Sequence, residues 1–239
     1  MGANATTSVP SYVAGEVLTA ADLNVTNSGI PVFADSTART NGFGGTGEKT
    51  LAEGQYAYLE DDNKTYVYDG AAWKEVGGAG LVLISSTTIG SAVSSVTVSN
   101  CFSSTYDHYK ITVNGGAGST PENLQMQLGA STTGYYDMIS YINTGTPATP
   151  LSTGTNNGSI WARVGAAMTS NIMADIDLGS PNLAKPTYFR ATYPYIASNF
   201  PGVAAGYHNV STAYTGFTLS PGSGTLTGGV IRVYGYQNS

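Results

Sequence analysis

Two carboxylates are spaced so that they could act together. Asp175 and Asp177 are separated by one residue within the largely alternating segment Ile172–Leu178. Side chains on a β-strand point alternately to opposite faces, so a strand here would place both carboxylates on the same face. Such a pair could bind a hard cation if further oxygen ligands came close. The simpler interpretation, which we favour, is a solvated outer strand face, so we predict no metal site.

The glycine-rich segment Gly42–Thr50 invites comparison with a phosphate-binding loop. That loop requires Lys and then Ser or Thr directly after its last glycine. Here Glu48 separates Gly47 from Lys49 and places a carboxylate where a phosphate would lie. We therefore interpret the segment as a flexible turn and predict no bound cofactor.

Residues suited to nucleophilic or zinc chemistry are scarce. Cys101 is the single cysteine and has the surroundings of a small buried hydrophobic residue. His108 and His208 are the two histidines, and neither lies in a recognisable motif. Three such residues hardly supply the ligands of a zinc site. The few acids after residue 80 leave a glycosidase pair open, but we predict that the protein is not an enzyme and name no catalytic residue.

Aromatic residues offer a different chemistry, because exposed Tyr and Trp rings suit flat sugar faces and protein interfaces. Several flank residues 143–158, the longest segment without a strand pattern, and long loops on rigid scaffolds often carry recognition. We predict surface recognition by Tyr135, Tyr136, Asn156 and Trp161. The alternative for each ring is packing between sheets or between protomers.

Composition narrows the classes of partner. Charged residues make up 10% of the 239 residues, against roughly 25% in a typical soluble domain. Ten acidic and four basic residues precede residue 80, whereas five of each follow it, which indicates a domain boundary near Gly77–Gly80. The scattered basic residues predict no nucleic-acid binding. No apolar run approaches about 18 residues, so we predict no membrane insertion.

The elements that would position these residues are β-strands. From residue 80 onward, short alternating segments are separated by Gly, Ser, Asn and Pro turns. They predict strands near 81–89, 94–99, 108–114, 123–129, 135–142, 159–166, 172–178, 186–193, 203–208, 214–219 and 229–236. This number of strands predicts an all-β fold, an antiparallel β-sandwich resembling a jelly roll over residues 80–239. The alternative is an immunoglobulin-like sandwich.

Two smaller parts precede this sandwich. The pattern of short strands and turns in residues 31–79 predicts a small tyrosine-rich β-meander with an Asp-Gly corner at Asp69. Residues 1–30 predict an extended anchor with one short helix that begins after Thr19. Val17, Leu18 and Leu23 form its apolar surface. A helix this short needs something to dock on, either a sister chain or a larger assembly.

Three segments together resemble bacteriophage virion proteins: the leader 15–24, the Tyr-Trp hairpin 56–73 and the closing strands 223–235. Similar segments occur in tail-fibre, receptor-binding and head-decoration proteins. The resemblance implies a homotrimeric structural protein on the exterior of the phage particle. Val17, Leu18 and Leu23 would then anchor the N-terminal part to other virion proteins, and the sandwich would contact a host-surface glycan or protein. The alternative that it leaves open is a capsid decoration protein or head fibre.

Overall fold

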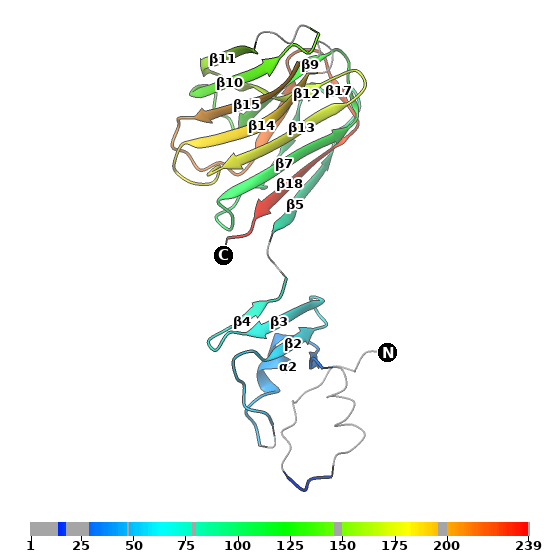
Figure 1. The fold of residues 1–239 in the computed structure, drawn as a ribbon, viewed down its shortest axis with the longest axis vertical. Helices are drawn as coiled ribbons and strands as arrows, with labels where there is room; N and C mark the ends of the chain where they lie inside the picture. Colours follow the sequence, from blue (N-terminus) through cyan, green and yellow to red (C-terminus); the bar gives the residue numbers. More distant parts are fainter. Residues whose placement is uncertain are drawn as a thin grey trace. The chain divides into compact units, whose positions relative to one another are not determined.

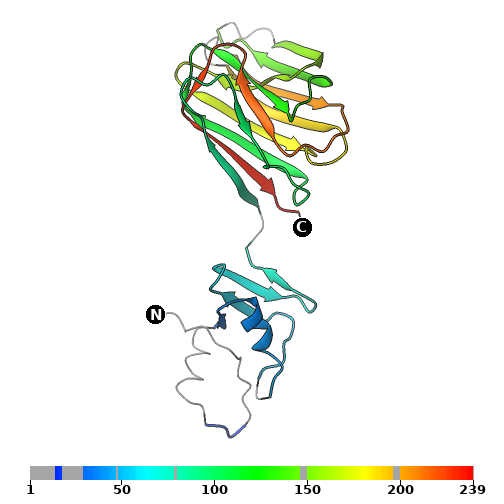
Figure 2. The same ribbon diagram turned by 180° about the vertical axis from the view of Figure 1, so that it is seen from behind.

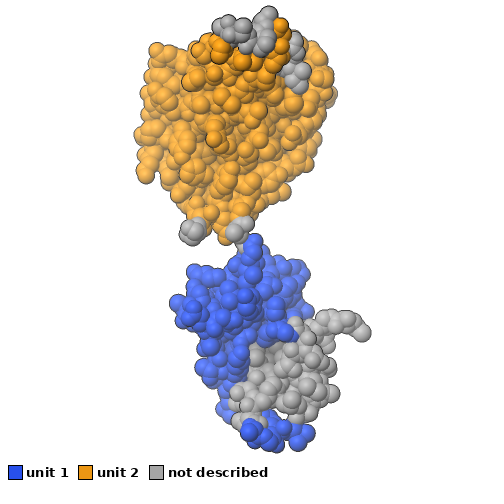
Figure 3. Space-filling view, viewed as in Figure 1, with its two compact units in different colours: residues 1–78 blue, residues 79–239 orange. Residues whose placement is uncertain are grey.

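The computed structural model describes residues 14–17, 29–46, 48–77, 80–145, 150–195 and 200–238. The chain divides into two compact units, which we call the small unit (residues 1–78) and the sandwich (residues 79–239), coloured separately in Figure 3. This division falls within the Gly77–Gly80 segment, where the charge composition changes. No helix among the described residues is long and apolar enough to cross a membrane.

Among its described residues, the small unit contains a four-stranded sheet and one short helix. Its first two strands are parallel, and the other neighbouring strands are antiparallel. The elements are β1 (Val32–Phe33), α2 (Ser36–Asn41), β2 (Tyr56–Leu59), β3 (Lys64–Tyr68) and β4 (Trp73–Glu75). The meander β2–β3–β4 lies where the sequence predicts it. The sequence does not predict the helix; it is capped by Asp35, whose carboxylate accepts a 2.8 Å hydrogen bond from the Ala38 N–H.

Arg39 is a buried cation at the centre of the small unit. Its guanidinium carbon lies 5.0 Å from the ring centroid of Tyr66 and 4.7 Å from that of Trp73. The apolar core beside it consists of Phe33, Ala57 and Leu59. Burial lowers the pKa of Arg39, although nearby acids act against this. The rings therefore replace part of the solvation that the charge loses on burial.

The sandwich is built from fourteen strands among its described residues. In chain order they are β5 (Leu81–Thr88), β6 (Val96–Val98), β7 (His108–Gly115), β8 (Ala117–Gly118), β9 (Glu122–Leu128), β10 (Tyr135–Ile142), β11 (Pro150–Gly158), β12 (Trp161–Ala167), β13 (Ile172–Gly179), β14 (Thr187–Tyr195), β15 (Phe200–His208), β16 (Phe217–Pro221), β17 (Leu226–Thr227) and β18 (Val230–Tyr236). The prediction of an all-β, antiparallel fold is confirmed. The jelly-roll strand order stays a prediction.

The strands form two layers. The front sheet runs in the order β11–β10–β15–β14–β13–β7–β18–β5, as the labels in Figure 1 show. The back sheet runs in the order β12–β9–β16–β6 and faces the viewer in Figure 2. The layers join where the end of β12 pairs with the start of β13. There Ala166 pairs with Met173, and Ala167 pairs with Ile172. A separate pair, β8 with β17, lies beside them.

The core between the layers is rich in aromatic rings. Phe102 packs against Tyr109 and Phe217, with ring centroids 4.8 and 5.6 Å apart. Fully burying a side chain of this size stabilises the fold by about 1.5–3 kcal/mol. Cys101 is buried beside these rings, and burial raises its pKa to about 12. Its prediction as a small buried residue is confirmed.

The last strand, β18, lies between β5 and β7 in the front sheet. Ile231 and Val233 are buried, whereas Arg232 and Tyr234 lie on the outer face, as the alternation predicts. The turn before β18 passes close to another turn at Gly116, where a β-carbon would overlap the carbonyl oxygen of Gly228. Both glycines have positive φ, 75° and 68°. The contact leaves no room for a side chain at Gly116, and the positive φ favours glycine at both positions.

Candidate functional site

The outer face of the front sheet carries a continuous row of aromatic side chains. Strand register places Tyr136 of β10 opposite Tyr207 of β15, and Tyr207 opposite Tyr188 of β14. The row continues through Gly179 of β13 to His108 of β7. Tyr136 and Tyr188 each lie between two buried residues, and Tyr207 and His108 each precede one, so their side chains point outward. We call Tyr136, Tyr207 and Tyr188 the tyrosine row.

The tyrosine row is ordered by ring contacts but still accessible. The rings of Tyr136 and Tyr207 stack, with centroids 4.7 Å apart and planes at 9°. Tyr207 is 48% exposed and Tyr188 is 50% exposed. Large apolar or aromatic side chains half open to solvent are typical of recognition surfaces when they gather in one place. The row therefore offers a flat, amphipathic surface.

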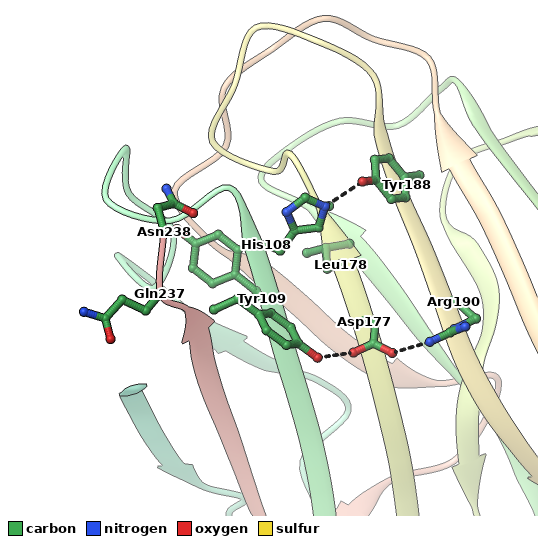
Figure 4. Close-up of a pocket in the computed structure, with 10 residues that line it drawn as sticks. His108, Tyr109, Asp177, Leu178, Tyr188, Arg190, Gln237 and Asn238 are labelled. Atoms are coloured by element: carbon green, nitrogen blue, oxygen red, sulfur yellow. Dashed lines mark hydrogen bonds and ion pairs between the residues drawn. The ribbon is translucent and has the colours of Figure 1, made fainter. Parts of the chain in front are cut away.

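Tyr188 owes its position to a glycine. Its ring lies over Gly179, where a β-carbon would overlap the ring atoms. Across this glycine, its hydroxyl lies 2.7 Å from Nε2 of His108, and Figure 4 shows the two side chains joined. A cross-strand aromatic ring over a glycine is a known stabilising pair in sheets. The hydroxyl end of the ring is thus held over Gly179, while half of the side chain stays exposed.

An open groove of about 590 Å³ lies beside Tyr188, within the size range of ligand sites. It is lined by the start of β7, the end of β13, the start of β14, and the end of β18 with the two residues that follow it (Figure 4). The lining residues are His108, Tyr109, Asp177, Leu178, Gly179, Tyr188, Arg190, Tyr236, Gln237 and Asn238. We call this hollow the groove.

Asp177 lies between the groove and a second hollow. It accepts hydrogen bonds from Tyr236, at 2.8 Å, and from Arg190, at 3.2 Å, and its Oδ1 lies 3.2 Å from Nζ of Lys110. Burial alone would raise the pKa of Asp177, but these hydrogen bonds outweigh it and hold the pKa below its usual value. The carboxylate is therefore ionised near neutral pH and acts as a fixed acceptor.

The second hollow has a volume of about 330 Å³. It shares Asp177 and Arg190 with the groove and extends over Lys110, Asp175 and Val203. Lys110 forms ion pairs with both Asp175 and Asp177. Burial would lower its pKa, but these hydrogen bonds raise it above the usual value. The two hollows adjoin at the Asp177–Arg190 pair.

Asp175 and Asp177, the two carboxylates that could bind a cation together, do lie on the same face of β13, as the alternation predicts. The cation beside them is the ammonium group of Lys110, one strand away on β7. Among the described residues, no group of three or more His, Cys, Asp or Glu side chains is arranged to hold a metal ion.

Two of the four predicted recognition residues are buried, and their prediction as surface residues is wrong. Trp161 is 0% exposed and packs against Phe189, with its indole N–H 3.2 Å from the Tyr207 carbonyl oxygen. Tyr135 is also 0% exposed, and its hydroxyl accepts a 2.8 Å hydrogen bond from the Leu128 N–H. Burial raises the pKa of Tyr135 to about 12. Both rings fill the space between the layers, which was the alternative weighed for each of them.

The other predicted residues fall in different places. Tyr136 lies on the outer face in the tyrosine row, and Asn156 is exposed on β11 at the edge of the front sheet. Residues 150–158 form that strand, so the expectation of a structureless loop over 143–158 is wrong for them. Of the predicted anchor, Val17 is 87% exposed, whereas Leu18 and Leu23 lie outside the described residues.

The sequence did not single out Tyr188, Tyr207, His108 and Tyr236 as one site. A signal existed for Tyr188: in the predicted strand 186–193 it alternates with Phe189 and Ala191, which marks it as outward-facing. Alternation does not show, however, which strands lie next to one another in the sheet. His108 and Tyr188 are 80 residues apart and meet only through the pairing of β7, β13 and β14.

No protein-family model matches the chain, and no curated protein matches its sequence.

Proposed function

We propose that this protein is a bacteriophage virion structural protein, a trimeric tail-fibre or tail-tip appendage that attaches to the host surface. The observation that carries the proposal is the tyrosine row beside the groove on the outer face of the front sheet. The resemblance of three segments to virion proteins supplies the biological setting.

The character of the outer face supports recognition of another molecule. Tyr rings provide large contact area at a low cost in conformational entropy and carry a polar hydroxyl. Tyr207 and Tyr188 leave about half of their surface accessible, and Met138 and Val203 on neighbouring strands are also exposed. These side chains lie on strands paired on both sides, so the surface is rigid and keeps its shape on binding.

In this proposal the two units have different roles. The small unit, with Val17, Leu18 and Leu23 in its leader, fixes the protein to other virion proteins. Three copies of the sandwich then present three binding faces on one assembly. Several weak sites on one rigid body raise the overall affinity without requiring a deep pocket in each copy.

Binding by the purified full-length chain tests the attachment function. We expect it to bind intact cells of at least one species in a bacterial panel and to sediment as a trimer. Tyr207→Ala should weaken cell binding at least fivefold, whereas Tyr56→Ala, at an exposed tyrosine of the small unit, should not. A well-folded trimer that binds no cells, or equal binding by both variants, would count against the proposal.

Antibody labelling of virions distinguishes the tail appendage from its alternative. An antibody against the sandwich should label the tail end of the particle. Dense labelling of heads would instead assign the protein to capsid decoration or to head fibres, and would leave the outer face of the sandwich without the proposed host contact.

A further inference from the structure

We infer that the groove binds an uncharged oligosaccharide, with one sugar ring on the open face of Tyr188 and the next over the Asp177–Arg190 pair. This inference rests on the proposed attachment function and names the chemical class of its ligand. It follows from the shape of the two hollows, the groups that line them and the balance of their charges.

The aromatic part of the site is a flat platform. The hydroxyl end of the Tyr188 ring lies over Gly179, and the half-exposed ring lines the groove. The hydrogen bond to His108 fixes the ring in this orientation. A sugar ring has a face of C–H groups that packs on such a surface and an edge of hydroxyls that needs hydrogen bonds.

Polar groups suited to those hydroxyls surround the platform. Figure 4 shows Gln237 and Asn238 on the side of the groove opposite Tyr188, with Asp177 and Arg190 along a third side. Gln237 lines the groove, and its side-chain amide carries both a hydrogen-bond donor and an acceptor. Arg190 is 78% exposed at its side chain and uses one nitrogen for Asp177.

The charges of the two hollows cancel. Lys110 and Arg190 are positive, Asp175 and Asp177 are negative, and each cation is paired with a carboxylate. An anionic ligand such as a sialylated or sulfated sugar would meet the two carboxylates and would gain no unpaired cation. Charge complementarity therefore favours a sugar without charge.

The location of the groove disfavours a peptide strand as its ligand. Peptides that add a strand to a sheet need an edge with free backbone groups. β7, β13 and β14 each have a paired neighbour on both sides, so their backbone hydrogen bonds are used within the sheet. The site must then recognise its ligand through side chains alone, which suits a sugar.

The size of the site favours more than one sugar ring. The groove and the second hollow share Asp177 and Arg190, so a chain that leaves the Tyr188 platform passes directly over this pair into the second hollow. We expect affinity to rise at least fivefold from a monosaccharide to the matching trisaccharide.

Glycan binding by the full-length chain tests the inference. An array of uncharged, sialylated and sulfated oligosaccharides is probed first, and the best uncharged trisaccharide is then titrated by calorimetry. Tyr188→Ala should weaken binding at least tenfold, and Gln237→Ala at least threefold. Tyr56→Ala is the matched control, since Tyr56 is 44% exposed in the small unit, and it should bind like the unchanged protein.

Cell binding separates failure of this inference from failure of the proposed function. Uncharged-glycan binding that depends on Tyr188 but comes without binding to any cell would uphold the site and reject host attachment. Cell binding that survives periodate oxidation of the cell-surface sugars, but not protease treatment, would overturn the inference and leave attachment standing. A preference for anionic glycans, or equal binding by Tyr188→Ala and Tyr56→Ala, would also overturn it.

Discussion

The ring of Tyr188 occupies the space that a side chain on Gly179 would fill, and its hydroxyl reaches His108 on β7, two strands away from β14. On the outer face of the sheet, the Tyr188 side chain therefore connects β14 with β7 across β13, and it fits there because Gly179 has no β-carbon.

This relationship predicts the effect of Gly179→Ala. The added methyl displaces the ring and breaks the 2.7 Å contact with His108, and overpacking of this kind costs about 1–3 kcal/mol. In a Tyr188→Ala background, the same substitution should cost at least about 1 kcal/mol less, because the ring is already gone. Urea unfolding of the two single variants and the double variant measures this coupling. Strictly additive free energies would contradict it.

Trp161 should be a stability residue. Trp161→Ala removes a fully buried indole and should lower the free energy of unfolding by about 3–5 kcal/mol. Circular dichroism during urea titration measures this without relying on the indole itself. Tyr207→Ala, at a half-exposed ring, is the comparison and should cost less than about 1 kcal/mol. Comparable losses in the two variants would show that Trp161 is not part of the packed core.

His208 should make the sandwich sensitive to acid. The imidazole is buried against Tyr135, Trp161 and Tyr214, and burial lowers its pKa below the usual 6.5. Above pH 6.5 both folded and unfolded chains carry it neutral, so the stability is fully present. Below pH 6.5 the unfolded chain binds the proton first, and stability falls by up to about 1.4 kcal/mol per pH unit until the folded pKa is reached.

The control for this pH dependence is His208→Gln, which cannot titrate in this range. Denaturation of both proteins between pH 5 and 8 should show a slope below pH 6.5 that is smaller in the variant. Carboxylates contribute equally to both proteins, so the difference isolates His208. Identical slopes would assign the acid sensitivity to other groups.

Arg39 should contribute to the stability of the small unit and not to that of the sandwich. Arg39→Ala removes its contacts with Tyr66 and Trp73 and should cost this unit about 1–3 kcal/mol. In a Trp161→Phe background Trp73 is the one remaining tryptophan, so its fluorescence follows the small unit. Far-ultraviolet circular dichroism follows the sandwich, whose midpoint should not move. A joint shift of both transitions would mean that the two units unfold together.

Much of the strand pattern could be predicted because alternation is a local property. In β18, for example, the residues that alternate in polarity are those that alternate in burial, from Ile231 and Val233 to Arg232 and Tyr234. β11 could not be predicted, since its Ser, Thr, Asn and Gly residues have the composition of a loop. Its strand conformation comes from pairing with β10, a tertiary contact that outweighs local preference.

The candidate site was harder to predict because it depends on which strands are neighbours. The predicted strands 214–219 and 229–236 follow one another in the sequence, yet β16 pairs with β9 and β6, whereas β18 pairs with β5 and β7. Alternation shows that Tyr136 and Tyr188 can face outward, but it does not place them in one row. The adjacent pair Tyr135–Tyr136 poses the same difficulty, since either ring could have been the buried one.

The central position of β18 has a consequence for synthesis on the ribosome. β5 is made early but pairs with β18 alone in the sheet, and roughly 140 residues of chain separate the two strands. At about 5–20 residues per second, β5 waits on the order of ten seconds for its partner. During that time the backbone groups of β5 that later pair with β18 have no partner strand, and this edge is open to chaperones and to neighbouring nascent chains.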